Sequence, residues 1–510
     1  MAVLIFGGLL VTHLAADSSD GDVVRYSDFG AVGNGKVDDF DALVKAHRHA
    51  NRHGLSVEAT DGATYYVGGA DQTIRVETNT NFGSATFVID DRKLENIRAN
   101  VFEVRSKLKP LKLDGISSLK RGQRQLPVKL PKPCVVIVTD SNTKRFMRLG
   151  LNLNQGKSQT DVFLVEADGS VDPRTPIIWD FDQLTSIEVL PVEPNTLTIK
   201  GGKFITIANQ AESVYDYHAR GISIRRSRVD VDGLEHRIQG EGKTGAPYSG
   251  FIQISKCAHV TVRNTKLTGH KTYRTIGRAG KPVSMGSYDL SANRALYVSL
   301  IHCTQTNDVM DSKYWGIIGT NFCKELLYDH CKLSRFDAHM GVTNATIRNS
   351  TLGYMGVRLI GSGKFLIENS SVHARHFIHF REDYGSTWRG EMTIRNCRFF
   401  PMGSSKSEPS ILGGFNSGQH DFGYTCYLPE RIVIDGLHIQ DQKKSKQRKG
   451  PSVFANFNSK MVDNSYVQKF PYMITEQLVV KKVTTESGKP LRLSKNPFMF
   501  RNVKVEGLKK

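Results

Sequence analysis

A short phrase of alternating apolar and polar residues recurs along the second half of this 510-residue chain. Its β-branched residues and its period of two predict a strand rather than a helix. The apolar positions Tyr328, Ile347, Ile367 and Ile394 match one another and are 19, 20 and 27 residues apart, which leaves room for a few short strands and their turns. The clearest copies are 222–229, 259–267, 326–333, 345–352, 365–372, 392–399 and 431–439.

A repeat of this kind predicts stacked coils. One coil of strands cannot bury its own inner face, but a stack of coils encloses a continuous apolar cylinder. Asn264, Asn349, Asn369 and Asn396 fall at equivalent turn positions, where asparagine tolerates left-handed backbone and stacked amides bond from coil to coil. A leucine-rich repeat is the structural rival, but its fixed Leu/Asn pattern is absent. We therefore predict an all-β chain forming a single-stranded right-handed parallel β-helix.

A motif near the N-terminus supports this fold. Residues 26–46 read YSDFGAVGNGKVDDFDALVKA. This segment resembles the N-terminal cap of the pectate-lyase-like superfamily, in which D-F-G-A-x-G-D-G-x-x-D-D precedes an amphipathic helix; here Asn34 replaces the usual Asp. The resemblance implies that a helix capped by Asp38 or Asp39, with Leu43 and Ala46 on its apolar face, plugs one end of the cylinder. It leaves the reaction open, because the superfamily includes lyases, hydrolases, epimerases and phage tailspikes.

The chain divides into four parts. Residues 1–17 have the short apolar run and small-residue site of a signal peptide, which predicts a secreted or periplasmic protein. Residues 18–85 form the N-terminal cap and first coils. The repeat is interrupted over 86–195, where alternating strands with turn signals predict an inserted small antiparallel β domain. Residues 196–510 form the main parallel β-helix, and no later apolar run approaches the roughly 18 residues of a membrane span.

Composition narrows the choice of partner. The net charge of +19 favours an anionic ligand, and we expect an acidic polysaccharide carrying carboxylates and sulfates. The basic tract at 443–449 is interpreted as a solvated loop, so no nucleic-acid partner is expected. Seven cysteines without a CxxC pair favour buried thiols over a disulfide scaffold or a zinc site. We expect a monomer.

Aligning the coils after their shared phrase predicts a site. His339 and Arg358 lie the same number of residues after the shared phrase of their coils, which places them in one column. A one-residue bulge adds His379, so that the three stack about 4.8 Å apart. Tyr354 and Tyr314 lie close to this column. The segments 270–273 and 288–293 supply secondary candidates. The residues predicted to contact substrate are Lys313, Arg335, Arg375, His376, Arg381, Glu382, Tyr384, Trp388, Arg389 and Asn293.

These residue types fit a polysaccharide lyase acting on uronic acids by β-elimination. Such an enzyme neutralises the sugar carboxylate, removes the C5 proton and protonates the leaving O4. We expect Arg358 to meet the carboxylate and His339 or His379 to act as base. Tyr354 or Tyr314 is then the acid, and Arg381 and Lys313 hold the chain.

Two other functions stay open. A β-helix glycoside hydrolase on a polyuronate needs paired carboxylates, and the phrase at 307–311 resembles polygalacturonase-like hydrolases only in part. A non-catalytic glycan-binding β-helix is the third possibility. No cofactor is expected, because Glu382 and Asp383 are adjacent, point oppositely in a strand and make no acidic cluster for Ca²⁺. Among substrates, the charge favours glycosaminoglycans such as chondroitin sulfate, dermatan sulfate or hyaluronan, and pectin and alginate stay open because charge alone does not distinguish polyuronates.

Overall fold

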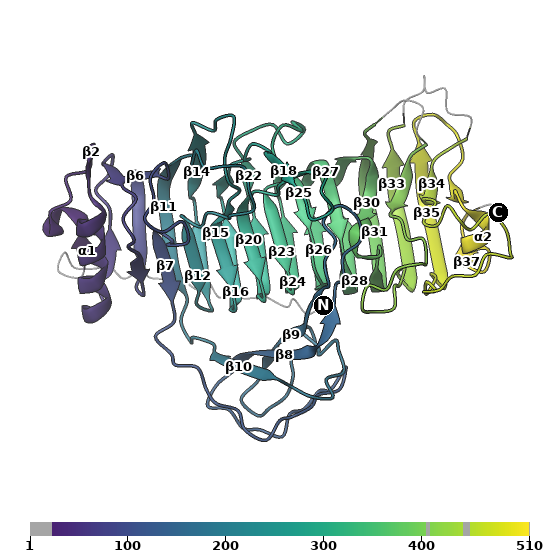
Figure 1. The fold of residues 1–510 in the computed structure, drawn as a ribbon, viewed down its shortest axis with the longest axis horizontal. Helices are drawn as coiled ribbons and strands as arrows, with labels where there is room; N and C mark the ends of the chain where they lie inside the picture. The colour runs from purple at the N-terminus through teal and green to yellow at the C-terminus, as the bar shows by residue number, and fades with distance from the viewer. Residues whose placement is uncertain (1–22, 404–407, 442–448, 509–510) are drawn as a thin grey trace, which may run out of the picture.

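The computed structural model describes residues 23–403, 408–441 and 449–508. The chain forms one long stack of coils, with the helix α1 (Phe40–His53) at one end and the C-terminal strands at the other (Figure 1). The predicted signal peptide and all but the last residue of the basic tract lie outside the described residues. Among the described residues, no helix has the length and apolarity needed to cross a membrane.

Two parallel sheets make the walls of the stack, and they confirm the predicted all-β parallel β-helix. The smaller sheet contains β5 (Ile74–Val76), β7 (Phe102–Arg105), β12 (Ile222–Arg225), β15 (Ser249–Ser255), β20 (Tyr288–Asn293) and β23 (Ile318–Asn321).

The larger sheet has 26 strands that wind along the whole stack. Its first half contains β1 (Val23–Arg25), β2 (Asn34–Asp38), β3 (Ser56–Glu58), β4 (Thr64–Val67), β6 (Thr80–Asp90), β11 (Leu197–Ile207), β13 (Val229–Asp232), β14 (Glu235–Gln239), β16 (Ala258–Arg263), β17 (Lys266–Leu267), β21 (Leu296–Ile301), β22 (Thr304–Gln305) and β24 (Lys324–Asp329). Its second half contains β25 (Lys332–Asp337), β26 (Val342–Arg348), β27 (Thr351–Leu359), β28 (Gly361–Glu368), β29 (Ser371–Ala374), β30 (His376–Phe380), β31 (Trp388–Pro401), β32 (Ser410–Gly413), β33 (Arg431–Ile439), β34 (Ser452–Phe454), β35 (Gln477–Thr485), β36 (Arg492–Ser494) and β37 (Lys504–Glu506).

The repeat sets the register between coils. Tyr328 pairs with Ile347, Ile347 with Ile367, and Ile367 with Ile394, and all four side chains are buried in the cylinder. The asparagines at the predicted turn positions have left-handed backbone, with φ of 52° at Asn349 and 49° at Asn369. The amide of Asn369 donates to that of Asn349 over 3.4 Å. The predicted amide contact between coils is therefore present.

The helix α1 closes the N-terminal end of the cylinder. Leu43, Ala46 and Ala50 are fully buried on its apolar face, as the resemblance implied. Asp39 is the N-cap and makes no side-chain capping bond, while the carboxylate of the preceding Asp38 accepts from the backbone N–H of Phe40, the first helical residue, over 3.0 Å. The short helices η1 (Tyr26–Phe29), η2 (Glu382–Tyr384) and α2 (Pro497–Phe500) complete the described helical segments.

The insertion is an antiparallel sheet that hangs below the stack (Figure 1). It consists of β8 (Cys134–Arg145), β9 (Lys157–Val165) and β10 (Ser186–Pro191), and it packs an apolar core of its own around Phe163 and Phe181. The strands β6 and β7 pair within the coil stack. The part that leaves the stack is therefore narrower than the predicted range 86–195. A second antiparallel pair, β18 (Arg274–Ile276) with β19 (Pro282–Ser284), forms a hairpin near the site described below.

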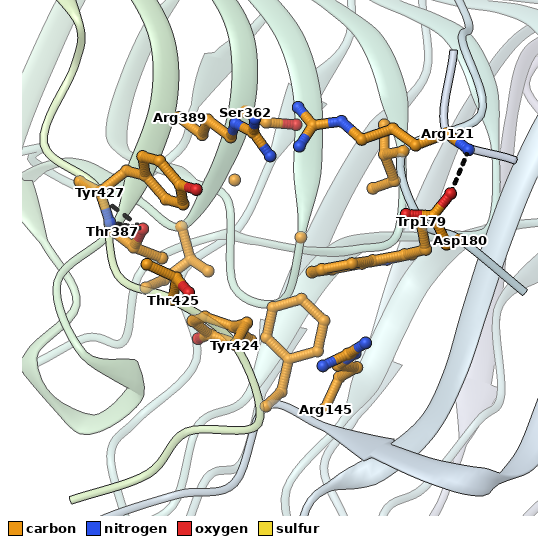
Figure 2. Close-up of a pocket in the computed structure, with 15 residues that line it drawn as sticks. Arg121, Arg145, Trp179, Asp180, Ser362, Thr387, Arg389, Tyr424, Thr425 and Tyr427 are labelled. Carbon is orange, nitrogen blue, oxygen red and sulfur yellow. Dashed lines mark hydrogen bonds between the residues drawn. The ribbon is translucent and has the colours of Figure 1, made fainter. Parts of the chain in front are cut away.

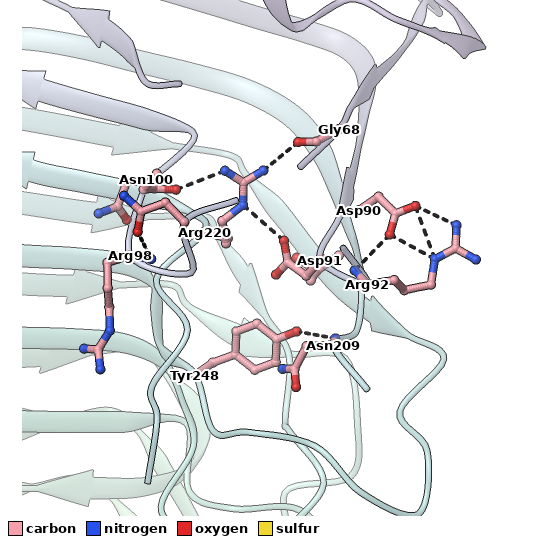
Figure 3. A network of polar contacts seen from close by, with 12 residues as sticks. Gly68, Asp90, Asp91, Arg92, Arg98, Asn100, Asn209, Arg220 and Tyr248 are labelled. Carbon is pink, nitrogen blue, oxygen red and sulfur yellow. Dashed lines mark hydrogen bonds and ion pairs between the residues drawn. The ribbon is translucent and has the colours of Figure 1, made fainter. Parts of the chain in front are cut away.

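A buried polar network joins the loops that follow β4 and β6 to Arg220, which lies just before β12 (Figure 3). The Arg220 guanidinium lies 3.3 Å from the Asp91 carboxylate and donates to the carbonyls of Gly68 and Ala99 over 2.8 and 3.0 Å. Each of its three nitrogens therefore has a partner, which a guanidinium removed from water requires.

Candidate active site

A pocket of about 390 Å³ lies where the predicted cluster was expected. The coils and their loops form most of it, and the insertion adds Arg148 and Asn152. Six predicted residues line it: His339, Arg358, His379, Arg335, Arg381 and Glu382. The other residues of the pocket are Tyr215, Tyr217, Ser284, Gly286, Tyr288, Trp315, Met355 and Asp383.

Parallel strand pairing decides which residues of neighbouring coils lie opposite one another in this pocket. Arg358 on β27 lies directly opposite His379 on β30, as the one-residue bulge predicts. On its other side Arg358 pairs with Asp337, and not with His339 as predicted. The reason is a register shift between Leu333 and Arg335, across which β27 carries two extra residues. His339 lies just beyond the end of β25 and still lines the same pocket.

The two pocket histidines are neutral. Burial lowers the pKa of His339 well below its usual value, and Arg381, Arg148, Arg335 and Lys157 lower it further. The Nδ1 atom of His339 lies 2.8 Å from the amide oxygen of Asn321. Because that oxygen only accepts, Nδ1 carries the proton and Nε2 keeps a lone pair. The imidazole is thereby held in the tautomer of a base.

His379 has a similar environment. Burial lowers its pKa well below the usual value, and Arg358, His376, Arg381 and Arg375 lower it further. Its Nε2 lies 3.7 Å from the Glu382 carboxylate. Because His379 pairs with Arg358 across the two coils, a neutral imidazole lies directly beside the Arg358 guanidinium.

Arg358 is the cation beside it. Its Nε donates to the carbonyl of Met355 over 3.3 Å, and it makes no ion pair within the described part of the chain. Burial lowers its pKa to about 10, together with the charges of Arg335 and Arg381. A half-buried guanidinium without a carboxylate partner favours an anionic ligand.

Other arginines in and around the pocket are paired with aspartates. Arg335 is ion-paired with Asp337, which also lies 3.6 Å from Arg381. Arg381 lies 3.0 Å from Asp383, which accepts from Arg148 of the insertion over 2.6 Å. Burial opposes ionisation of Asp383, but Arg381 and Arg148 outweigh it and lower the pKa of this carboxyl. Counting Arg358, four arginines lie in and around the pocket. The carboxylates near them are those of Asp337, Asp383 and Glu382.

Tyr288 lies in the wall of the pocket, within one of the secondary candidate segments. Burial raises its pKa, while Arg335 acts in the opposite direction, so that the phenol is protonated at neutral pH. Tyr215 and Tyr217 line the pocket beside it, with ring centroids 6.3 Å apart.

Several predicted residues lie elsewhere. Trp388 is fully buried in the coil core and donates to the carbonyl of Gly363 over 3.1 Å, and Tyr384 is only 2% exposed. Their prediction as substrate contacts is therefore wrong. Tyr354 donates its hydroxyl to the backbone carbonyl of Tyr314. Neither tyrosine lines the pocket, and this bond occupies the proton that Tyr354 would have to give.

The remaining predicted contacts also lie outside the pocket lining. Asn293 accepts from Arg294 over 3.3 Å at the end of β20. His376 is half-buried, with its ring 5.5 Å from that of His379. Lys313 and Arg375 are exposed, and Arg389 lines a different pocket, described below.

Sequence reasoning missed the residues that the loops and the insertion bring in. Arg148, Asn152, Tyr215 and Tyr217 belong to no repeat, so counting along coils does not reach them. The only signal for the tyrosines is their alternate spacing. In the described ranges, no group of three or more His, Cys, Asp or Glu is arranged to hold a metal ion. All seven cysteines are buried and unpaired.

Comparison with known proteins finds similarity in structure alone. No family model matches the chain, and no curated protein does either. The tailspike gp61 of Pseudomonas phage phi297 is 12% identical, with 96% of this chain and 84% of that chain covered and a TM-score of 0.56. Gp54 of Acinetobacter baumannii bacteriophage AP22, solved with a capsular saccharide, is 10% identical over 95% and 79%, with a TM-score of 0.49. At these identities the first likeness supports the fold and says nothing of the reaction.

Proposed function

We propose that this protein is a polysaccharide lyase that cleaves an acidic, uronic-acid-containing glycan by β-elimination. The observation that carries the proposal is the direct pairing of the neutral His379 with the unpaired Arg358 in one pocket. Elimination from a uronate needs these two groups side by side, because the carboxylate must be neutralised while the adjacent C5 proton is removed.

The steps follow from the placement of the side chains. Arg358 binds the sugar carboxylate and stabilises the negative charge that develops there as the C5–H bond breaks. The lone pair of His379 accepts this proton, with His339 as the alternative base. The C4=C5 double bond forms as the C4–O4 bond breaks, and the Tyr288 hydroxyl gives its proton to the leaving O4. Base and acid each contribute on the order of 10²–10⁴-fold.

The charge of the site supports an anionic substrate. Arg335 and Arg381 are largely offset by Asp337 and Asp383, whereas Arg358 has a free positive charge. The surplus of +19 over the whole chain adds a long-range attraction that salt weakens. Glycosaminoglycans such as chondroitin sulfate, dermatan sulfate or hyaluronan are the substrates we propose.

The same contacts argue against the hydrolase alternative. A hydrolase needs two carboxylates free to act as acid and as base or nucleophile. Asp337 is fully buried under Arg335, and Asp383 is bonded to Arg148 and Arg381. Glu382, 54% exposed at its side chain, is the one carboxylate of the pocket without an arginine partner within ion-pairing distance.

The test is incubation of the purified protein with a panel of acidic polysaccharides, followed by the ultraviolet absorbance of an unsaturated uronate. We expect absorbance to rise with at least one glycosaminoglycan and with no neutral glycan. New reducing ends without this absorbance indicate hydrolysis. Salt-sensitive binding without either product indicates a non-catalytic glycan-binding protein, and both results overturn the proposal.

A further inference from the structure

A second pocket, of about 280 Å³, lies between the insertion and the coil stack. The insertion contributes Trp179 and Arg145, and the coils and their loops contribute Arg389, Tyr424 and Tyr427. Figure 2 shows Trp179 on one side of this pocket and Tyr427 on the other, with the open space between them. We call it the junction pocket.

The junction pocket is separate from the candidate active site, because the two share no lining residue. The chain segment after β8 divides them. Phe146 lines the junction pocket and packs edge-on against Tyr384, whereas Arg148 lines the candidate active site. Gly341 permits this arrangement, since a Cβ there would lie 2.7 Å from the Phe146 ring.

The lining of the junction pocket combines aromatic faces with guanidinium groups. Arg145 lies over the Trp179 ring, 4.8 Å from its centroid, and Arg389 lies over Tyr427 at 4.7 Å. An aromatic face suits the apolar face of a sugar ring, and a guanidinium suits a carboxylate or sulfate.

Positive charge exceeds negative charge in this pocket. Arg389 lies 3.8 Å from Glu430, but neither Arg121 nor Arg145 makes an ion pair with any residue the structure describes. The one carboxylate of the lining, Asp180, accepts from the backbone N–H of Arg121 over 3.0 Å (Figure 2). The Arg121 side chain is exposed at the rim and available to a ligand.

The size of the pocket limits its occupant. Its volume is near the lower end of the roughly 300–1,000 Å³ of small-molecule pockets, which suits one sugar unit. A wider hollow of about 800 Å³ shares Arg121, Ser362 and Arg389 with it, and there the rest of a chain has room to continue.

We propose that the junction pocket is a second binding site for one anionic sugar unit of a glycan chain, distinct from the candidate active site. This inference rests on the ligand class of the proposed function and not on its reaction. Trp179 and Tyr427 flank the sugar unit on its two sides, and Arg121 and Arg145 bind its carboxylate or sulfate.

The experiment uses tryptophan fluorescence in the full chain. The protein has three tryptophans, of which Trp388 is fully buried and Trp315 lines the candidate active site. In a Trp315→Phe/Arg358→Ala protein, turnover is expected to fall about 10²–10³-fold, and a ligand-induced change in fluorescence reports Trp179. We expect a saturating change with a chondroitin sulfate hexasaccharide and none with neutral maltohexaose.

Matched variants test whether the fluorescence change comes from a ligand bound in the junction pocket. In the same background, Arg121→Ala and Tyr427→Ala are each expected to weaken the hexasaccharide about tenfold, the usual effect of losing one charged or aromatic contact. Arg124→Ala, an exposed arginine of the same loop outside the pocket lining, is expected to leave affinity unchanged.

A missing fluorescence response, or one insensitive to both variants, overturns the inference. Failure of this second-site inference can be distinguished from failure of the proposed lyase activity. If the native protein yields unsaturated product but Trp179 does not respond, only the second site is wrong. If Trp179 responds as expected but no unsaturated product forms, only the lyase is wrong.

Discussion

The contacts that hold the coils of the stack together differ from those that attach the insertion to the stack. Within the stack, strands pair in parallel with those of the next coil over a continuous apolar core. The insertion has its own core and meets the stack through a small apolar cluster and through polar contacts that include the buried Lys324–Asp161 pair and the Arg148–Asp383 bond. The stack therefore fixes the spacing of the reactive groups, and the insertion supplies a wall to both pockets.

The largest expected effect concerns the stack. His379→Ala and His339→Ala remove the two possible bases, and the variant lacking the true base is expected to lose about 10²–10⁴-fold in kcat. Initial rates of unsaturated product formation measure this. His373→Ala is the matched control, because His373 is stacked on Phe400 outside the pocket. Equal, near-native rates in all three variants would move the site elsewhere.

The next effect concerns the attachment of the insertion. Lys324 and Asp161 lie 2.7 Å apart with side chains 2% and 1% exposed. Lys324→Met leaves the Asp161 carboxylate buried and unpaired, so we expect a loss of about 3–5 kcal/mol in the free energy of unfolding, measured with urea. The double variant Lys324→Met/Asp161→Leu is expected to be more stable than the single one. A single variant as stable as the native protein would mean that this pair does not hold the insertion.

A smaller effect tests whether the insertion shapes the candidate active site. Arg148→Ala removes the bond to Asp383, which Arg381 also holds. We expect KM for the glycan to rise about tenfold, because the wall of the pocket loosens while the reacting groups stay in the stack. Lys129→Ala, an exposed change in the same insertion, is the control. If KM is unchanged in Arg148→Ala, the insertion does not contribute to this site.

The smallest effect is on the pH dependence. The base must be neutral, and burial and nearby arginines lower the pKa of His379 well below its usual value. Activity is therefore retained as pH falls below about 6.5 and is lost only at lower pH, as the imidazole becomes protonated. Arg375→Ala removes one of these charges and is expected to move the acid limb of kcat/KM to higher pH. An acid limb at or above 6.5, or a shift to lower pH, contradicts this assignment.

The coil stack and the insertion also differ in how well their site residues could be predicted from the sequence. The pairing of Arg358 with His379 follows from the repeat, because parallel coils keep their register across one bulge. The position of His339 does not, since two extra residues in β27 place Asp337 opposite Arg358. Arg148 and Asn152 were not predictable, because only tertiary packing brings the insertion against the stack. Trp388 resembled a surface contact in sequence but fills the apolar cylinder.

The central claim is that Arg358 neutralises a uronate carboxylate beside a neutral histidine. The most direct measurement compares the rate of unsaturated uronate formation in Arg358→Ala with that in the native protein, and uses the exposed Arg375→Ala as the matched arginine control. We predict a loss of about 10²–10³-fold in Arg358→Ala and less than a severalfold change in Arg375→Ala at their pH optima. Equal rates in the two variants, with both proteins folded, would contradict the account.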